Sequence, residues 1–395
     1  MSEWRTVPIK ELYHGLYDGP HATPKPAEEG PIFLGIKNVT DEGSLDLKTI
    51  RHIHDSEFAR WTKRVEPTEG DIVFTYEATL NRYAIIPKNF KGCLGRRMAL
   101  IRPNTEVVDT RFLHFYFFSK QWRDVIESNK LTGATVDRIP LTTFPNYPVS
   151  LPPLPEQKRI AGILSAYDDL IENNLRRIQI LEDMAQSLYR EWFVHFRIPA
   201  DILTKAGLPP QLTLTNDSPL GPIPEDWEVK KLGEIATVKW GDTSTTKKAY
   251  TEEGFVAYSA AGQDGLLDHF DNERTGIVLS AIGANCGRTW LAAGKWSSIK
   301  NTMQLWSDSP RLSTELLYLS TLGKDKWPKR GAAQPFISQG DAKGMQTVVP
   351  TAQINGMATS RIRPLFESIR LLEKKNKNLR ETRDLLLPKL LTPAS

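Results

Sequence analysis

Cysteine is scarce in this chain of 395 residues, which contains two, Cys93 and Cys286. Two cysteines so far apart exclude a disulfide scaffold and a cysteine-rich zinc module, and they fit a reducing compartment. No stretch approaches the ~18 consecutive apolar residues of a membrane span, and the opening MSEWRTVPIK lacks the apolar core of a signal peptide. We therefore expect a cytoplasmic protein with no membrane partner.

A large excess of one charge sign is also missing. The 51 lysines and arginines against 47 acidic residues give a net charge of +4 and a pI near 8.8. Such a mildly basic chain permits a nucleic-acid partner without proving one, because the distribution of charge matters more than its sum. The composition, 40% hydrophobic and 25% charged, is ordinary for a globular protein.

Several catalytic signatures are absent. The sequence has no G-x-x-x-x-G-K-[ST] phosphate loop and no acidic-Pro-Pro-aromatic word of the kind that adenine methyltransferases use. His52 and His54 would share one face of a strand beside Asp55, but a clear third ligand is missing, so we expect no metal site. Cys286 lies between glycines in GANCG, which favours a tight turn over a nucleophile. We expect no catalytic residue in this chain.

The chain repeats itself at about half its length. Five short words recur in the same order, with a spacing that drifts from 223 to 198 residues. The pairs are EWRTVPIKEL (3–12) with DWEVKKLGEI (226–235), GDIVF (70–74) with TGIVL (275–279), RMAL (97–100) with TMQL (302–305), TRFLHF (110–115) with TELLYL (314–319), and TGAT (132–135) with RGAA (330–333). Each match is weak, but the shared order favours a duplication over coincidence.

Each half begins with a mixed, strand-rich region. Short β-branched and aromatic runs alternate with turn residues; the expected strands are 72–76, 83–86, 98–101, 277–280 and 303–306. Short helices are expected at 110–128 and 313–323. Six prolines between Pro140 and Pro155, and six more between Pro199 and Pro224, predict irregular connectors.

Each half ends in a long helix, from about 156 to 196 and from about 354 to 391. Apolar residues recur at heptad spacing over four to five heptads, which is typical of a coiled coil. Pro364 lies early in the second helix and is expected to kink it, and Pro388 to end or bend it.

Asn174 and Asn376 are the only asparagines of the two seams. If the helices are antiparallel and the two asparagines face each other, every other facing pair is apolar except Tyr167 with Arg383. A buried asparagine is a known device for fixing register. The alternative is that each asparagine only touches solvent at the edge of its seam.

Three further words carry a family resemblance. They are LPPLPEQKRIAGILSAYDDLIENN (151–174), MAQSLYREWFVHF (184–196) and SPLGPIPEDWEV (218–229). In this order the chain resembles the specificity subunit of type I restriction-modification systems over its whole length. The second helix departs from the pattern, because PTAQ (350–353) replaces the P-E-Q lead-in.

The resemblance implies an α+β fold with a pseudo-twofold repeat, in which two target-recognition domains are separated by two long antiparallel helices. The segments are domain 1 (1–154), helix 1 (155–197), a Pro-rich linker (198–224), domain 2 (225–351) and helix 2 (352–395). Each domain would read half of a bipartite, asymmetric site in double-stranded DNA.

The resemblance also implies the partners. Two modification subunits would bind S-adenosylmethionine and methylate adenine, and two restriction subunits would hydrolyse ATP with magnesium and cut DNA. The chain itself would hold no cofactor and have no catalytic activity. Two alternatives stay open: a scaffold that reads no sequence, and the equivalent subunit of a solitary methyltransferase system without a nuclease.

Candidate DNA contacts are basic and amide residues in expected loops, because Arg and Lys suit guanine and phosphate whereas Asn and Gln suit adenine. They are Lys63, Arg64, Arg82, Arg96 and Arg97 in the first half, and Lys247, Lys248, Gln263, Arg288, Lys300 and Asn301 in the second. Arg82 and Arg288 occupy corresponding places in the repeat. The alternative for each is an ordinary surface residue.

The helices are expected to act as a ruler. About 29 residues of matched helix span roughly 44 Å, which is on the order of 13 base pairs. The two half-sites should then be separated by an unread spacer of about one turn of DNA.

Overall fold

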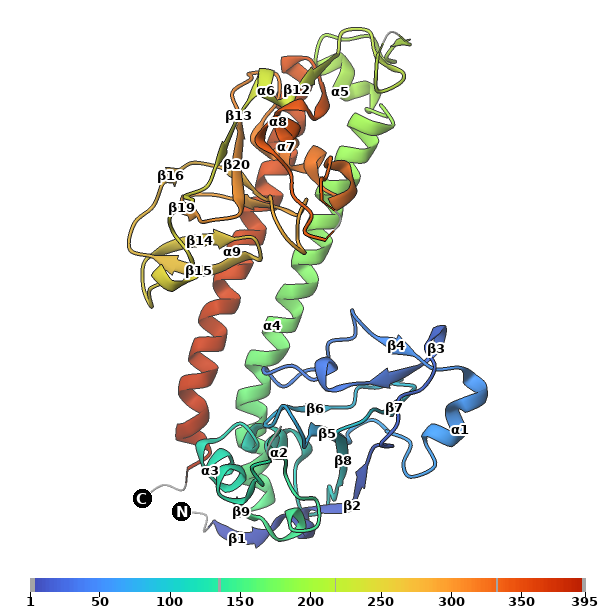
Figure 1. Cartoon of the computed structure of the whole chain (residues 1–395), viewed down its shortest axis with the longest axis vertical. Helices are drawn as coiled ribbons and strands as arrows, with labels where there is room; N and C mark the ends of the chain where they lie inside the picture. Colours follow the sequence, from blue (N-terminus) through green and yellow to red (C-terminus); the bar gives the residue numbers. More distant parts are fainter. Residues whose placement is uncertain (1–3, 134–135, 217, 332, 393–395) are drawn as a thin grey trace. The chain divides into compact units, whose positions relative to one another are not determined.

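The computed structural model describes residues 4–133, 136–216, 218–331 and 333–392. Contacts divide the chain into an N-terminal unit, Met1–Asn173 with Lys375–Ser395, and a C-terminal unit, Asn174–Lys374. Two helices continue from one unit into the other: α4 (Leu154–Tyr189), extended by a π-helical turn at Arg190–Val194, and α9 (Ala352–Leu390). The fold is α+β, with a strand-rich globular domain in each unit (Figure 1).

The N-terminal unit contains two small sheets and a strand pair. Its sheets have the strand orders β2-β8-β5-β6 and β4-β3-β7, and β1 pairs with β9. The strands are β1 (Arg5–Pro8), β2 (Tyr13–Asp18), β3 (Ala27–Leu34), β4 (Arg51–His52), β5 (Ile72–Thr75), β6 (Tyr83–Ile85), β7 (Gly92–Leu94), β8 (Met98–Pro103) and β9 (Pro148–Leu151). The short helices are α1 (Phe58–Trp61), α2 (Thr110–Tyr116) and α3 (Lys120–Asn129).

The C-terminal unit repeats this plan. Its sheets have the orders β13-β20-β17-β18 and β15-β14-β19-β16, with the pairs β12-β21 and β10-β11. The strands are β10 (Leu214–Thr215), β11 (Ile223–Pro224), β12 (Glu228–Lys231), β13 (Ala236–Trp240), β14 (Phe255–Ser259), β15 (Gly262–Leu267), β16 (Asn272–Glu273), β17 (Gly276–Ser280), β18 (Thr289–Ala292), β19 (Lys295–Ser298), β20 (Thr302–Ser307) and β21 (Gln346–Val349). The short helices are α5 (Ala200–Lys205), α6 (Leu232–Ile235), α7 (Thr314–Thr321) and α8 (Gln339–Gly344).

The strand pairing confirms the internal repeat and corrects one of its matches. Thr75 faces Met98 between β5 and β8, and Ser280 faces Thr302 between β17 and β20. Met98 therefore corresponds to Thr302, a spacing of 204 residues rather than the 205 that aligns the methionines of RMAL and TMQL. The difference matters because a shift of one residue moves every side chain of a strand to the opposite face.

Three expectations about local structure were wrong in detail, one for a helix and two for the Pro-rich connectors. The expected helix at 110–128 is two helices, α2 and α3. The Pro-rich connectors contain regular elements, namely β9 in the first and α5, β10 and β11 in the second. Pro148 is tolerated because β9 belongs to a two-stranded pair with a free edge, where a missing N–H costs little. The expectation that Pro388 ends the second long helix is confirmed, because α9 ends two residues after it; α9 continues through Pro364, where a kink stays a prediction.

Aromatic side chains dominate the core of the N-terminal unit. Trp122 and Tyr83 are fully buried, and the indole Nε1 of Trp122 donates a hydrogen bond to the hydroxyl of Tyr83 at 2.8 Å. The rings of Phe117 and Phe144 pack against Trp122, with centroids 4.9 and 5.9 Å away. Because the buried polar groups of Tyr83 and Trp122 satisfy each other, this core keeps large aromatic rings without an unpaired donor.

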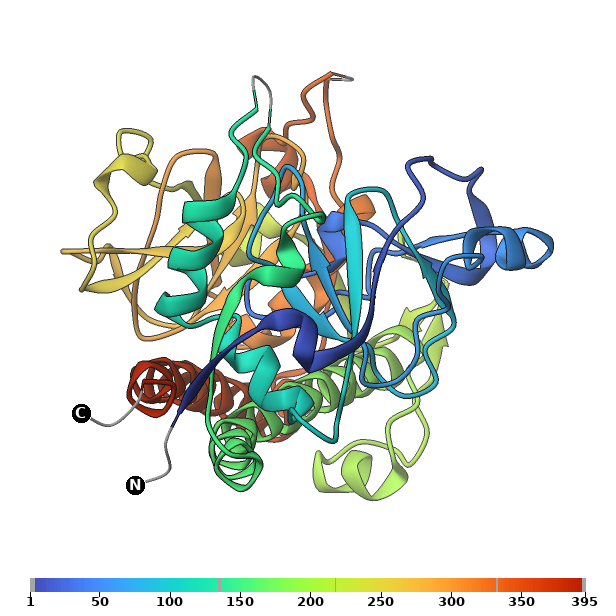
Figure 2. The same cartoon turned by 90° about the horizontal axis from the view of Figure 1, so that it is seen from below.

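The long helices pack against each other within each unit. In the N-terminal unit α9 lies beside α4 (Figure 1 and Figure 2), and Leu164 of α4 shares a core with Leu386 of α9. In the C-terminal unit Ala185 of α4 shares a core with Ile362 of α9. The beginning of each helix therefore meets the end of the other, so the pair is antiparallel.

The polar positions of the seams are buried. Asn174 and Asn376 are 8% and 2% exposed, which does not fit the alternative that they sit at a solvent edge. Their mutual pairing would join the two units and stays a prediction. Arg383, expected to lie opposite Tyr167, forms an ion pair with the adjacent residue Asp168, with Nη1 and Oδ1 2.5 Å apart.

Both halves use the same tether between a short helix and the start of a long one. The Oε1 of Gln157 accepts a hydrogen bond from the backbone N–H of Asp109, the N-cap of α2, at 2.8 Å. The Oδ1 of Asn355 accepts one from the N–H of Ser313, the N-cap of α7, also at 2.8 Å. The two spacings of 204 and 198 residues show that this tether was duplicated with the chain.

Removing the buried tether should destabilise α2. Gln157 is 1% exposed, and its amide also donates to the carbonyl of Pro152 at 2.8 Å. Gln157→Ala leaves buried backbone groups without partners, each at a cost of about 1–3 kcal/mol. We expect faster hydrogen exchange at the amides of α2. Gln179→Ala, which removes an exposed glutamine from the same helix, should change the free energy of unfolding by less than about 0.5 kcal/mol; equal exchange in both variants would contradict the role of the tether.

Candidate nucleic-acid interface

Two predicted arginines of the N-terminal unit lie around Tyr76, directly after β5. Burial raises the pKa of Tyr76, Asp18 and Glu77 raise it further, and the nearby guanidinium groups of Arg64 and Arg96 lower it. Arg64 also forms an ion pair with Asp18 through Nη1. Its side chain remains 52% exposed, so it can exchange the aspartate for a phosphate or a base edge.

Arg82 and Arg288 occupy the same place in the two β-hairpins. The carbonyl of Arg82 accepts from the N–H of Thr75 at 3.1 Å, and that of Arg288 from the N–H of Ser280 at 2.8 Å. Their side chains differ. Arg82 binds both carboxylate oxygens of Asp41, at 2.7 and 2.9 Å, and is 24% exposed, whereas Arg288 is an exposed residue. Arg82 would have to leave Asp41 to contact DNA.

Three of the predicted residues of the C-terminal unit share one shallow cavity. Lys247, Lys300 and Asn301 line a space of about 320 Å³ together with Asn285. The Nζ of Lys247 also lies 2.5 Å from a carboxylate oxygen of Asp264. Amide and ammonium groups that converge in one hollow are the donors and acceptors that base-edge readout requires.

Three other predicted residues are Lys63, Lys248 and Gln263. Lys63 and Lys248 are exposed, and they are the sequence neighbours of Arg64 and Lys247; Lys248 lies in the short 3-10 helix Lys247–Ala249. Gln263 lines a different and larger cavity, beside Trp290 and Tyr318. The structure thus gathers some candidates and separates others, and contact of any of them with DNA stays a prediction.

Arg97 and Asn301 are the equivalent pair that the corrected alignment reveals. The carbonyl of Arg97 accepts from the N–H of Tyr76 at 3.2 Å, and that of Asn301 from the N–H of Ala281 at 2.9 Å. Both have left-handed backbone angles, with φ of 70° and 71°. A residue other than glycine in this region is uncommon and is often found at functional sites. Arg97 is 32% exposed and lies 3.0 Å from the carboxylate of Glu77, so it is held in place without being covered.

Sequence reasoning missed several polar residues near these groups. Arg138 and Arg330 stand at the base of corresponding loops. One loop is closed by an isolated antiparallel β-bridge between Leu131 and Arg138, and the other by a β-bridge between Arg330 and Phe336. The TGAT and RGAA match pointed to these loops, although Ala134, Thr135 and Ala332 lie outside the described residues. Asn285 and Tyr76 were missed because only the folded hairpins bring them to the site.

The residues considered for metal binding and for nucleophilic catalysis, His52 and Cys286, contact backbone carbonyl groups. His52 Nδ1 lies 2.7 Å from the carbonyl of Gly30. Cys286 is 3% exposed, its Sγ lies 3.3 Å from the carbonyl of Ala281, and burial raises the pKa of its thiol. Within the described ranges, no three His, Cys, Asp or Glu side chains are grouped to hold a metal ion. In the same ranges no helix is long and apolar enough to span a bilayer.

Comparisons with known proteins agree on one family. A family model described as "Type I restriction modification DNA specificity domain" matches residues 1–183 and 224–381. The MjaIX specificity subunit of Methanocaldococcus jannaschii is 25% identical over 97% of this chain and 87% of its own length. The HindI specificity subunit of Haemophilus influenzae is 24% identical over 82% and 86%. The crystal structure of a type I S subunit from M. genitalium has the same fold, with a TM-score of 0.59 at 19% identity over 100% of this chain and 97% of that one.

Proposed function

Because the chain belongs to the family of type I restriction-modification DNA specificity subunits, we propose that it reads a bipartite, asymmetric DNA site, one half-site with each unit. The family assignment makes DNA sequence recognition its function. That the site has two different halves is our inference from the internal repeat, in which equivalent positions carry different side chains.

The observation that carries this proposal is the pair Arg97 and Asn301. Arg97 directly precedes β8 and Asn301 directly precedes β20, the second strands of corresponding four-stranded sheets, and both keep a strained backbone conformation. Arginine pairs well with guanine and asparagine with adenine in the major groove. One recognition scaffold with two different reading groups would produce two different half-sites.

We further propose that the long helices position two modification subunits. Large apolar side chains stay exposed along them: Leu170 and Leu385 in the N-terminal unit, and Leu175, Ile180, Met184 and Leu371 in the C-terminal unit, each between 49% and 69% exposed. Exposed apolar surface of this kind favours docking of a protein partner. The internal repeat supports two similar docking surfaces on one chain.

In this proposal the chemistry belongs to the partners. The modification subunits supply S-adenosylmethionine and adenine methylation, and two restriction subunits, where present, supply magnesium-dependent ATP hydrolysis and cleavage. This chain selects the DNA sequence and has no catalytic step of its own. Whether the complex includes a nuclease or is a solitary methyltransferase is decided by co-purification of a restriction subunit.

The test is to assemble the chain with modification subunits and map methylated adenines in genomic DNA. We expect methylation at one asymmetric motif made of two short half-sites and an unread spacer. Methylation without a motif would support the non-reading scaffold instead. Methylation at a single continuous motif would contradict the division of recognition between the two units.

A further inference from the structure

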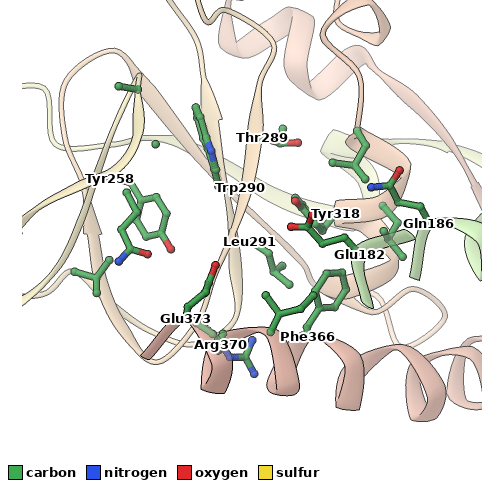
Figure 3. Close-up of a pocket in the computed structure, with 18 residues that line it drawn as sticks. Glu182, Gln186, Tyr258, Thr289, Trp290, Leu291, Tyr318, Phe366, Arg370 and Glu373 are labelled. Carbon is green, nitrogen blue, oxygen red and sulfur yellow. The ribbon is translucent and has the colours of Figure 1, made fainter. Parts of the chain in front are cut away.

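The C-terminal unit contains a second, larger cavity of about 670 Å³, which includes Gln263 and shares Ala261 with the hollow around Lys247, Lys300 and Asn301. Helices α4, α7 and α9 and strands β14, β15 and β18 line it (Figure 3). Four aromatic rings face it, those of Tyr258, Trp290, Tyr318 and Phe366. Its volume lies within the ~300–1,000 Å³ that is usual for small-molecule sites.

Two carboxylates and one guanidinium give the cavity a net negative lining. Glu182 comes from α4, and Glu373 and Arg370 come from α9. In Figure 3 the carboxylate of Glu373 is directed toward Tyr258 and that of Glu182 toward Tyr318. Burial raises the pKa of Glu373 and the charge of Glu182 raises it further, while Arg370 lowers it. The two carboxylates are therefore close enough to repel each other.

The N-terminal unit shows why this space is open. Tyr318 corresponds to His114, since each is the fifth residue after the N-cap of its helix. In the N-terminal unit the 35–50 connection between β3 and β4 lies over this position: a Cβ on Gly43 would be 2.9 Å from the rings of both His114 and Phe118. In the C-terminal unit the corresponding connection, between β14 and β15, has only Ala260 and Ala261. A shorter loop leaves the cavity uncovered.

We propose that this cavity binds a small organic cation with two or more ammonium groups on an aliphatic chain, a linear polyamine. Two carboxylates on separate helices can each accept charge-assisted hydrogen bonds from one ammonium group. The aromatic faces attract cations and cover the methylene groups between the charges. The same lining repels phosphates and carboxylates, which excludes nucleotides. This binding does not depend on the DNA-reading function.

The experiment is titration calorimetry of the full chain with spermidine, and with butane-1,4-diol as a neutral control. We expect one spermidine per chain and no heat from the diol. The double variant Glu182→Gln/Glu373→Gln should weaken binding at least roughly tenfold, because it removes both charged acceptors. Glu381→Gln, which makes the same change on an exposed part of α9 outside the cavity, should leave the affinity unchanged.

Two further readouts separate this site from general attraction to surface charge. Spermidine should slow hydrogen exchange in β14, β18 and α7 of the unmodified chain. Affinity should fall as pH is lowered through the raised pKa of Glu373, because protonation removes the negative charge of this carboxylate, which shares the cavity with Glu182, Tyr258, Tyr318 and Arg370. Equal binding by the double variant, or no binding at millimolar spermidine, would overturn the proposal, and neither result would affect the methylation motif.

Discussion

Duplicating one heptad in each long helix should move the methylated site to a new DNA sequence with the same half-sites and a spacer about 3 base pairs longer. Repeating residues 174–180 in α4 and 376–382 in α9 adds about 10 Å of helix to each, at 1.5 Å per residue. About 3.4 Å of duplex per base pair converts this length into the spacer change. A seven-residue insertion keeps the apolar seam in phase, so the helices still pair.

Loss of methylation at the original site should be essentially complete. With longer helices the two recognition domains are too far apart to read both half-sites of the original sequence at once. The control repeats only five residues in each helix. That insertion turns the following seam by about 140° at 100° per residue, so the helices cannot pair and we expect no active complex. Methylation of the original site by the seven-residue variant would show that the helices do not set the spacer.

Replacing Arg97 or Asn301 by glycine should relax recognition at one base pair of one half-site. Glycine removes the side chain and adopts the left-handed backbone angle without strain, so the fold should be retained. Loss of a base-reading contact costs about 1–3 kcal/mol in discrimination, which is roughly a tenfold to hundredfold change in preference. Methylome sequencing of cells with each variant measures this directly.

The two variants should act on different half-sites, because the residues belong to different units. Arg60→Ala, which removes an arginine whose side chain is 77% exposed, provides the control and should leave the motif unchanged. Uniform weakening over all sequences, together with a lower salt dependence, would assign Arg97 or Asn301 to the phosphate backbone instead.

The repeat and the long helices could be predicted because their signals are local or periodic. Strands β5 and β17 appear in the sequence as matching apolar words, and the heptads of α4 and α9 extend over several turns. The Pro-rich connectors could not be predicted in detail, because β9 exists only through its pairing with β1. The equivalence of Arg97 with Asn301 was hidden by an attractive alignment of two methionines, which strand pairing showed to be one residue out of register.

The sequence by itself determined that the chain is a duplicated α+β protein with paired long helices, and its sequence motifs identified the family. Tertiary structure decided which polar side chains can act together. Arg82 and Arg288 occupy the same backbone position, yet Asp41 holds one of them and the other is exposed. The cavity beside Tyr318 exists because a connection that is long in one half is short in the other. Heptads and strand words are properties of neighbouring residues, whereas ion pairs and cavities depend on residues that only folding brings together.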